Sequence, residues 1–363
     1  MNASRTGRSA ALIVTGLLAI GCGSQPGGSA STTGQEGTSP SATDAPSVST
    51  STASPPSTST TVPTPTTDTV VPDVNEGTIE IPSGEISVGP NDLLVVHVDG
   101  DLWLHPGALG DVSGTALRLA DLGDPRVEVV EGPGPNAVDD VAGEVNGAVF
   151  FSDCCEPISG NLLAATSENS DRITLGPGYS PVLNPDRTKL ATANSYGLSV
   201  IDLSTGSYAA RSLDNGVPFI NAWDLMWTPD GASLVMLYFD DSGFGLMPFS
   251  AESPFVQGAP TSLGLDFDPS TSPSVHLAGR GPTGEIAVAV GDSKTTLIRY
   301  FDAATLLEIP QMQRDLPAGV QSVRLANDGV GLLWIDKTTL WYLPANGDVR
   351  DLGFGYSAAW FAT

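Results

Sequence analysis

The chain has 363 residues, of which 41 are acidic and 15 are basic, so its formal net charge is −26. Such a surface repels nucleic acid and anionic lipid headgroups, which excludes both as partners bound through charge. The acidic balance suits solubility in a salty medium, and in a binding protein it would attract cations or a basic partner. The chain has three cysteines, Cys22, Cys154 and Cys155.

The first 21 residues are typical of an export signal. Arg5 and Arg8 give a positive start, and the apolar run from Ala10 to Ile20 is 11 residues long, too short to span a bilayer comfortably. The run ends in Leu-Ala-Ile-Gly-Cys, which resembles the bacterial lipobox. That resemblance implies cleavage after Gly21, a lipid on Cys22 and a lipoprotein anchored to the outer, extracytoplasmic side of the cell membrane. The alternative is an ordinary signal peptide with a chance cysteine.

Residues 22–77 are rich in Ser, Thr, Pro, Gly and Ala. Because large apolar side chains are almost absent, this stretch cannot bury enough surface to offset the entropy of ordering it. We therefore expect a disordered stalk that holds a folded domain, residues 78–363, away from the membrane. Flexible-chain scaling gives the stalk an end-to-end distance of roughly 40 Å.

The folded part repeats one pattern. A turn rich in Asn, Asp, Gly and Pro is followed at once by a short apolar strand, then by a polar loop and another strand. These turns lie at residues 89–92, 144–147, 184–187, 228–231, 281–284 and 326–329. The apolar strands after them are expected at residues 93–98, 148–151, 190–193, 234–239, 286–290 and 330–335. Such a repeat is typical of the four-stranded blades of a β-propeller.

The pattern predicts an all-β fold, a six-bladed β-propeller closed by the C-terminal strand. Inner strands precede five of the turns, at residues 138–141, 179–183, 225–228, 274–277 and 320–325, and the first blade lacks one. The segment from Gly355 to Phe361 supplies the missing strand, because its Gly-Tyr-Ser echoes Gly178-Tyr179-Ser180. Closure of this kind removes exposed sheet edges. A seventh blade is the alternative if Glu80 to Val88, or residues 250–275, form another sheet.

Two segments carry a family resemblance. Pro229-Asp230-Gly231 before a hydrophobic strand, and the Ile-Asp-Leu-Ser-Thr-Gly ending at Gly206, resemble the PD-type repeat of TolB-like, WD-repeat-like propellers. The resemblance covers the third and fourth blades well and the others loosely. Trp223-Asp224 precedes an inner strand, so it is not the closing dipeptide of true WD repeats. The resemblance implies the fold and not the function, because propellers host binding modules, scaffolds and enzymes alike.

Carboxylates are expected to gather on one face of the ring. In propellers the loops between second and third strands share a face with the loops that join blades, and five of the six such loops here carry an acid. The candidate binding face comprises Asp99, Asp101, Asp153, Glu156, Asp240, Asp241, Asp292 and Asp336. Several oxygen ligands suit calcium, and an amine-bearing ligand would also suit them. The alternative is that Asp is common in the turns of an acid-rich chain.

Cys154-Cys155 is the most unusual local feature. In an exported protein these thiols meet an oxidising medium and can form a vicinal disulfide that stiffens the loop. Neighbouring Cα atoms lie about 3.8 Å apart across a trans peptide, below the usual disulfide range, so such a bond is strained and more easily reduced. Free thiols, pairing between chains and a ligand-contacting or redox role are the alternatives. A zinc site is not expected here, and His97 reads as a packed side chain rather than a ligand.

Motifs for catalysis are absent from the sequence. It has no Gly-x-Ser-x-Gly elbow, no Cys–His pair at a recognisable spacing and no phosphate-binding loop, and we expect no cofactor. The tryptophans are expected to pack in the core, with Trp223 and Trp227 as exceptions. The sequence therefore favours an extracytoplasmic binding or scaffold protein that presents an acidic face to a protein partner or envelope component. The alternatives are a hydrolase or lyase that uses loop carboxylates, with or without calcium, and a spacer without a ligand.

Overall fold

The computed structural model describes residues 74–361, and the predicted signal peptide, Cys22 and most of the predicted stalk lie outside the described residues. Gaps within this range fall at residues 111–112, 121–137, 154–159, 195–196, 213–220, 241–242, 254, 266–273, 292–294 and 318–319. Apart from one short 3₁₀ helix, η1 (Pro310–Met312), the regular secondary structure of the described part consists of strands. Over these residues we find no helix with the length and hydrophobicity to cross a membrane.

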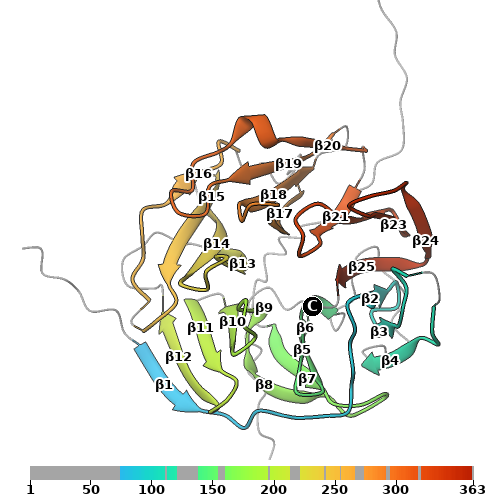
Figure 1. Ribbon diagram of the computed structural model, residues 1–363. Helices are drawn as coiled ribbons and strands as arrows, with labels where there is room; N and C mark the ends of the chain where they lie inside the picture. Colours follow the sequence, from blue (N-terminus) through green and yellow to red (C-terminus); the bar gives the residue numbers. More distant parts are fainter. Residues whose placement is uncertain are drawn as a thin grey trace, which may run out of the picture. The chain divides into compact units, whose positions relative to one another are not determined.

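Six antiparallel sheets stand around a ring (Figure 1), which confirms the predicted six-bladed β-propeller. Blade 1 is built from β25 (Tyr356–Phe361), β2 (Leu93–His97), β3 (Leu102–His105) and β4 (Leu117–Ala120). Blade 2 is built from β5 (Val138–Val145), β6 (Ala148–Asp153), β7 (Asn161–Ala165) and β8 (Ile173–Pro177). Blade 3 is built from β9 (Tyr179–Leu183), β10 (Lys189–Asn194), β11 (Gly197–Asp202) and β12 (Ser207–Ser212), with β1 (Val74–Thr78) added outside β12.

The other three blades follow the same order from the centre outward. Blade 4 is built from β13 (Asn221–Trp227), β14 (Ser233–Asp240), β15 (Gly243–Ser250) and β16 (Thr261–Ser262). Blade 5 is built from β17 (Ser274–Arg280), β18 (Ile286–Gly291), β19 (Thr296–Phe301) and β20 (Arg314–Leu316). Blade 6 is built from β21 (Val320–Leu325), β22 (Leu332–Asp336), β23 (Thr339–Leu343) and β24 (Arg350–Phe354).

The second strand of each blade is buried on both faces, which explains the continuous apolar runs in the sequence. In β18, Ile286 and Val288 pack toward blade 4, whereas Ala287 and Ala289 pack toward blade 6. Successive side chains of a strand point to opposite faces, so one strand fills the two junctions beside its blade. Among the described residues six hydrophobic clusters result, one between each pair of neighbouring blades.

The C-terminal strand closes the ring, as the sequence predicts. β25 lies beside β2 in Figure 1 and pairs with it from Leu93–Phe361 to His97–Tyr356. Ala359 and Trp360 of β25 are buried, and they belong to the clusters on the two sides of blade 1. The last strand of the chain therefore completes the first blade.

The chain enters the ring at blade 3 and crosses blade 2 before it begins blade 1. β1 pairs with β12 over five residue pairs, from Val74–Arg211 to Thr78–Ser207. The sequence assigns residues 74–77 to the stalk, but the structure places them in this fifth, outermost strand of blade 3 (Figure 1). Their polar side chains give no strand signal, and the strand forms because β12 offers an open edge for pairing.

Residues 79–88 form a strap across blade 2 rather than a seventh blade. Backbone N–H groups of Ile79, Gly84 and Ile86 donate to carbonyls in the turns of blades 2 and 3. Gly84 allows this close approach, because a Cβ there would lie 2.2 Å from the carbonyl oxygen of Thr166. These turns connect first to second strands and third to fourth strands, and we call this end of the ring the strap face.

Candidate functional site

The predicted acidic loops lie at the opposite end of the ring, which we call the junction face. Because neighbouring strands are antiparallel, the connections between second and third strands share this end with the connections between blades. The described members of the predicted binding face at this end are Asp99, Asp101, Asp153, Asp240 and Asp336. Glu156, Asp241, Asp292 and the Cys154-Cys155 pair lie outside the described residues.

Three of these carboxylates have hydrogen-bond partners close by in the chain. Asp101 is 5% exposed and forms an ion pair with Arg118 at 3.3 Å. Asp153 accepts the backbone N–H of Asn161 at 2.7 Å, and Asp99 accepts that of Asp101 at 3.2 Å. Within the part of the chain that the structure describes, no group of three or more His, Cys, Asp or Glu side chains could hold a metal ion. These three carboxylates therefore support their own hairpins rather than one shared ligand centre.

Exposed apolar side chains meet acidic loops where blades 6 and 1 join. Phe354 at the end of β24 is 80% exposed, and Val98 at the end of β2 is 55% exposed. The backbone connects them, because the N–H of Val98 donates to the carbonyl of Gly355 at 3.0 Å, and the N–H of Gly355 donates to that of Thr338 at 2.7 Å. We call this part of the junction face the closure corner: Val98, Asp99, Lys337 and Phe354.

A charged cluster that sequence reasoning missed lies on the innermost strands. Asp140 of β5 accepts the indole N–H of Trp360 of β25 at 2.6 Å, and it faces Arg324 of β21 at 3.6 Å. The Arg324 guanidinium also lies over the Trp360 ring, 5.7 Å from its centroid. Only 15% of the Asp140 side chain and 19% of the Arg324 side chain are exposed. Three blades, 1, 2 and 6, are thus connected through one carboxylate.

Two further side chains connect blades 4, 5 and 6. Asp224 of β13 accepts the N–H of Leu225 in its own strand and the N–H of Leu277 in β17, each at 2.8 Å. His276 of β17 accepts the N–H of Val323 in β21 through its Nε2 atom at 3.0 Å. The contacts to Leu277 and to Val323 each cross from one blade to the next. The inner strands are therefore held together by side chains as well as by apolar packing.

Burial sets the protonation states of this cluster. It raises the pKa of Asp224 to about 7, and the nearby negative charge of Asp140 adds to the effect, whereas Arg324 opposes it. Burial also raises the pKa of Asp140, again opposed by Arg324. His276 is affected in the other direction: burial and the positive charge of Arg324 lower its pKa to about 3. The His276 imidazole is therefore neutral at pH 7, as its acceptor role requires.

Backbone irregularity accompanies these inner strands. In every blade the register shifts once or more where the innermost strand pairs with the second strand. A bulge re-aims the side chain that follows it, and in β13 the shift falls between Ala222 and Asp224. The available sequence signal is a charged or imidazole side chain inside an otherwise apolar inner strand, as at Asp224, His276 and Arg324.

Trp227 is a core residue, so the expectation that it is an exception to core packing is wrong. Its side chain is fully buried, and its indole N–H donates to the carbonyl of Val182 in blade 3 at 2.9 Å. Burial satisfies both the large apolar ring and its single donor. The side chain of Trp223 lies outside the described residues.

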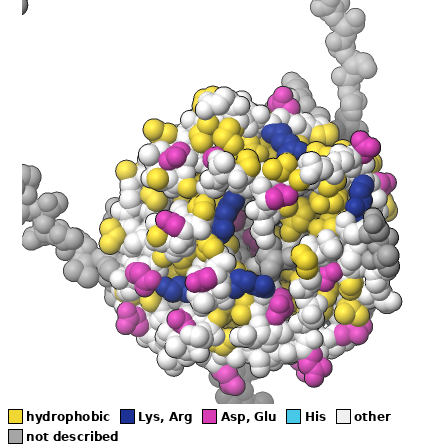
Figure 2. Space-filling view, in the orientation of Figure 1, with side chains coloured by type: hydrophobic (Ala, Val, Ile, Leu, Met, Phe, Trp, Pro, Cys, Tyr) yellow, Lys and Arg dark blue, Asp and Glu magenta, His cyan; other side chains and the backbone are white. Residues whose placement is uncertain are grey.

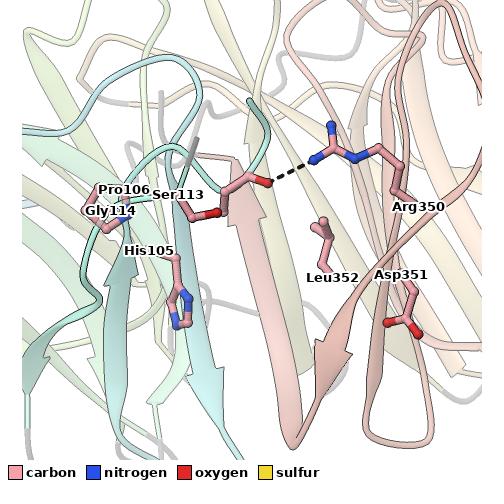
Figure 3. A pocket seen from close by; sticks show the side chains of 8 residues that line it. His105, Pro106, Ser113, Gly114, Arg350, Asp351 and Leu352 are labelled. Atoms are coloured by element: carbon pink, nitrogen blue, oxygen red, sulfur yellow. Dashed lines mark hydrogen bonds between the residues drawn. The ribbon is translucent and has the colours of Figure 1, made fainter. Parts of the chain in front are cut away.

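A pocket of about 280 Å³ lies between blade 1 and the outer strand of blade 6. Figure 3 shows His105, Pro106 and Ser113 on one side and Arg350, Asp351 and Leu352 on the other. The Arg350 guanidinium is engaged, because it donates to the carbonyls of Ala108, Leu109 and Gly110 at 2.9–3.3 Å. His105 brings a half-buried imidazole to this pocket from the end of β3.

Comparison with known proteins gives similarity of fold alone. No family model and no curated protein matches the sequence. Among solved structures, a nidogen–laminin complex matches 70% of this chain and 89% of that chain, with 13% identity and a TM-score of 0.47. TolB from Acinetobacter baumannii matches over 74% of this chain and 67% of that chain, with 13% identity and a TM-score of 0.45.

A third match has longer coverage but no greater likeness. A chain of a mitotic checkpoint complex matches 85% of this chain and 87% of that chain, with 13% identity and a TM-score of 0.41. At such identities and TM-scores, none of these matches carries an argument about what the chain binds or does. By its own strand order, the chain is a six-bladed β-propeller whose first blade is completed by its last strand.

Proposed function

We propose that the chain is a membrane-anchored, extracytoplasmic binding or scaffold protein that presents its acidic junction face to a protein partner of the cell envelope. The observation that carries this proposal is the closure corner, where Phe354 is 80% exposed and Val98 is 55% exposed. Aromatic side chains are enriched in protein interfaces and often provide most of the binding energy. An exposed phenylalanine at the end of a strand is therefore a natural anchor for a partner.

The surroundings of Phe354 suggest the chemistry of that partner. Asp99 is exposed in the same corner, and the chain as a whole carries a net charge of −26. Charges at the rim of an interface steer approach and select the partner more than they add affinity. The matching surface would have an apolar centre with basic groups around it. Nucleic acid does not fit, because its phosphates carry the same sign of charge as this protein.

The second candidate function is a hydrolase or lyase that uses carboxylates, with or without calcium. The observation in its favour is Asp224, because a pKa of about 7 is suited to proton transfer near neutral pH. Against it, both oxygens of Asp224 accept backbone N–H groups, so its described role is to connect blades 4 and 5. A binding function leaves Asp224 in this structural role.

Membrane attachment depends on Cys22 in this proposal. We expect replacement of Cys22 by serine to move most of the protein from the membrane fraction to the soluble fraction of the host cell. Acyl chains provide the anchoring free energy, about 0.8 kcal/mol for each buried CH₂ group, and serine cannot carry the thioether. Fractionation and immunoblotting measure the distribution. Cys154→Ser is the matched control and should stay in the membrane fraction; a membrane-bound Cys22→Ser variant would rule out this anchor.

The binding face can be tested by site-specific photo-cross-linking in intact host cells. A photoreactive phenylalanine at position 354 should capture one partner protein, identified by mass spectrometry after purification through a C-terminal tag. The matched control is position 307: Leu307 is 65% exposed and lies on the strap face, so it should not capture that partner. Phe354→Ser should lower affinity for the identified partner about tenfold or more, and Asp99→Asn should slow association.

The outcomes separate the two candidate functions. Capture of the same protein at positions 354 and 307, or of none, contradicts a binding role for the closure corner. In that case the enzyme alternative predicts that Asp224→Asn abolishes turnover of a substrate found in a hydrolase and lyase screen with and without calcium. The binding hypothesis predicts that the screen finds no substrate. It also predicts that cross-linking at position 354 captures the same partner in independent cultures.

A further inference from the structure

Two of the three histidines in the chain meet in blade 1. His97 ends β2, His105 ends β3, and their Nε2 atoms lie 3.3 Å apart. Their ring centroids are 5.5 Å apart, with an angle of 29° between the ring planes. The two Nε2 atoms therefore approach each other, although the residues stand at opposite ends of the hairpin.

This separation matches the spacing of two ligands on one metal ion. Imidazole nitrogens bind Zn²⁺ at about 2.0–2.1 Å in tetrahedral geometry, which places two such nitrogens about 3.3–3.4 Å apart. We propose that His97 and His105 chelate one divalent transition-metal ion, Zn²⁺ or Cu²⁺, through their Nε2 atoms. The remaining coordination positions take water or an external ligand from the pocket between blades 1 and 6.

The protonation state suits this role. Burial lowers the pKa of the His97 imidazole, and burial together with the nearby His97 lowers that of His105. The neutral imidazole is the form that binds a metal ion, so burial favours chelation over protonation of these rings. The negative charges of Asp99 and Asp101 act on the pKa of His97 in the opposite direction. Negative charges near a site favour the binding of a divalent cation.

Neighbouring aromatic rings restrict how the imidazoles can turn. Tyr356 meets His97 edge-on at 5.1 Å and His105 edge-on at 5.8 Å. Trp103 packs against His97 with ring centroids 5.1 Å apart. Because these contacts hold both rings in place, little side-chain freedom remains to be lost when an ion binds. The pair is therefore preorganised for chelation.

The site adjoins the 280 Å³ pocket between blades 1 and 6, because His105 is one of the residues that line this pocket. Imidazole ligands suit Cu²⁺, Ni²⁺ and Zn²⁺, and among these Cu²⁺ should bind most tightly.

The test titrates Zn²⁺ into the full chain purified without a polyhistidine tag. The ring nitrogen signals of the three histidines are followed by NMR, and the heat of binding by calorimetry. Signals of His97 and His105 should shift with one equivalent of Zn²⁺, whereas His276 should not respond, because its Nε2 atom already accepts the N–H of Val323. Ring signals report on these side chains directly, so ion binding at the cysteines does not imitate the result.

Two variants give an independent measurement. His97→Gln and His105→Gln should each lower the affinity for Zn²⁺ at least tenfold, because either change leaves a single imidazole. Zn²⁺ should also raise the melting temperature of the wild-type chain and not that of the variants. Unchanged ring signals of His97 and His105 at millimolar Zn²⁺, or equal binding by the wild type and both variants, would show that the pair is only a hydrogen bond between two neutral rings.

Discussion

Deletion of residues 356–363 is expected to abolish cooperative folding of the propeller. The truncation removes β25, the innermost strand of blade 1, and so leaves the edge of β2 unpaired at the centre of the ring. It also removes buried Ala359 and Trp360 from the clusters on both sides of that blade, and the indole donor from Asp140. An open ring with an unpaired inner edge has no means to bury these surfaces. Far-UV circular dichroism during heating, together with limited proteolysis, measures whether cooperative unfolding is lost.

The matched control removes the other terminal strand. A chain that lacks residues 74–78 loses β1, which lies outside β12 and has no fully buried side chain. We expect this variant to fold and to unfold cooperatively, with stability lowered by about 1–3 kcal/mol. If the chain without β25 kept a cooperative transition at the wild-type temperature, closure by the C-terminal strand would not be what holds the ring together.

Replacement of Arg324 by methionine is expected to destabilise the ring strongly, and more at pH 8 than at pH 5. At pH 8 the free energy of unfolding should fall by about 3–5 kcal/mol, because Asp140 and Asp224 are left buried without the positive charge of Arg324. Arg324 lowers the pKa of both carboxyls, so its removal raises both pKa values further. A carboxyl whose folded pKa exceeds its unfolded value loses stability as pH rises through the folded pKa. At pH 5 the Asp224 carboxyl, whose pKa is already about 7 in the wild type, is protonated in the folded variant, so the cost is smaller.

Denaturant unfolding at the two pH values measures this difference. The control is the double variant Arg324→Met with Asp140→Asn, which removes one buried negative charge and keeps an oxygen to accept the Trp360 indole N–H. At pH 8 the double variant should lose less free energy of unfolding than Arg324→Met alone. The stability of the double variant should also depend less on pH. An equal loss at pH 5 and pH 8 for Arg324→Met would mean that the guanidinium acts by packing on Trp360 rather than by its charge.

The second strands could be predicted from the sequence because burial on both faces leaves an unmistakable apolar run. The prediction for residues 93–98 differs by one residue from β2 (Leu93–His97), and that for residues 286–290 by one from β18 (Ile286–Gly291). The turns before the second strands could also be predicted from the sequence. Gly231 and Gly329 both adopt φ of +68°, a conformation that glycine takes without strain and that explains the Asp-Gly pairs there.

The outer strands could not be predicted, because they are short, half-exposed and polar. β16 has two residues, Thr261–Ser262, and β20 has three, Arg314–Leu316, so neither carries a periodic apolar pattern. β1 reads as part of a disordered stalk for the same reason. These strands form where a neighbour presents an open edge, and that information belongs to the assembled blade rather than to the local sequence.

The charged cluster could not be predicted for a different reason. Asp140, Asp224 and Arg324 are separated by most of the length of the propeller domain, and they approach each other only when the ring closes. A lone acid in an inner strand is visible in the sequence, but its partner is not. The closure corner has the same origin, since Val98 and Phe354 belong to the first and last blades.

The entry of the chain at β1 also determines how the protein would carry mechanical load. A pull on the chain before Val74 acts first on the five residue pairs between β1 and β12, and next on the backbone hydrogen bonds of the strap. Only after these give way does tension reach β2 and the closing pair with β25. The contacts of β1 and the strap therefore break before those of the inner ring. Under load the propeller should detach β1 from blade 3 while blades 4, 5 and 6 stay folded.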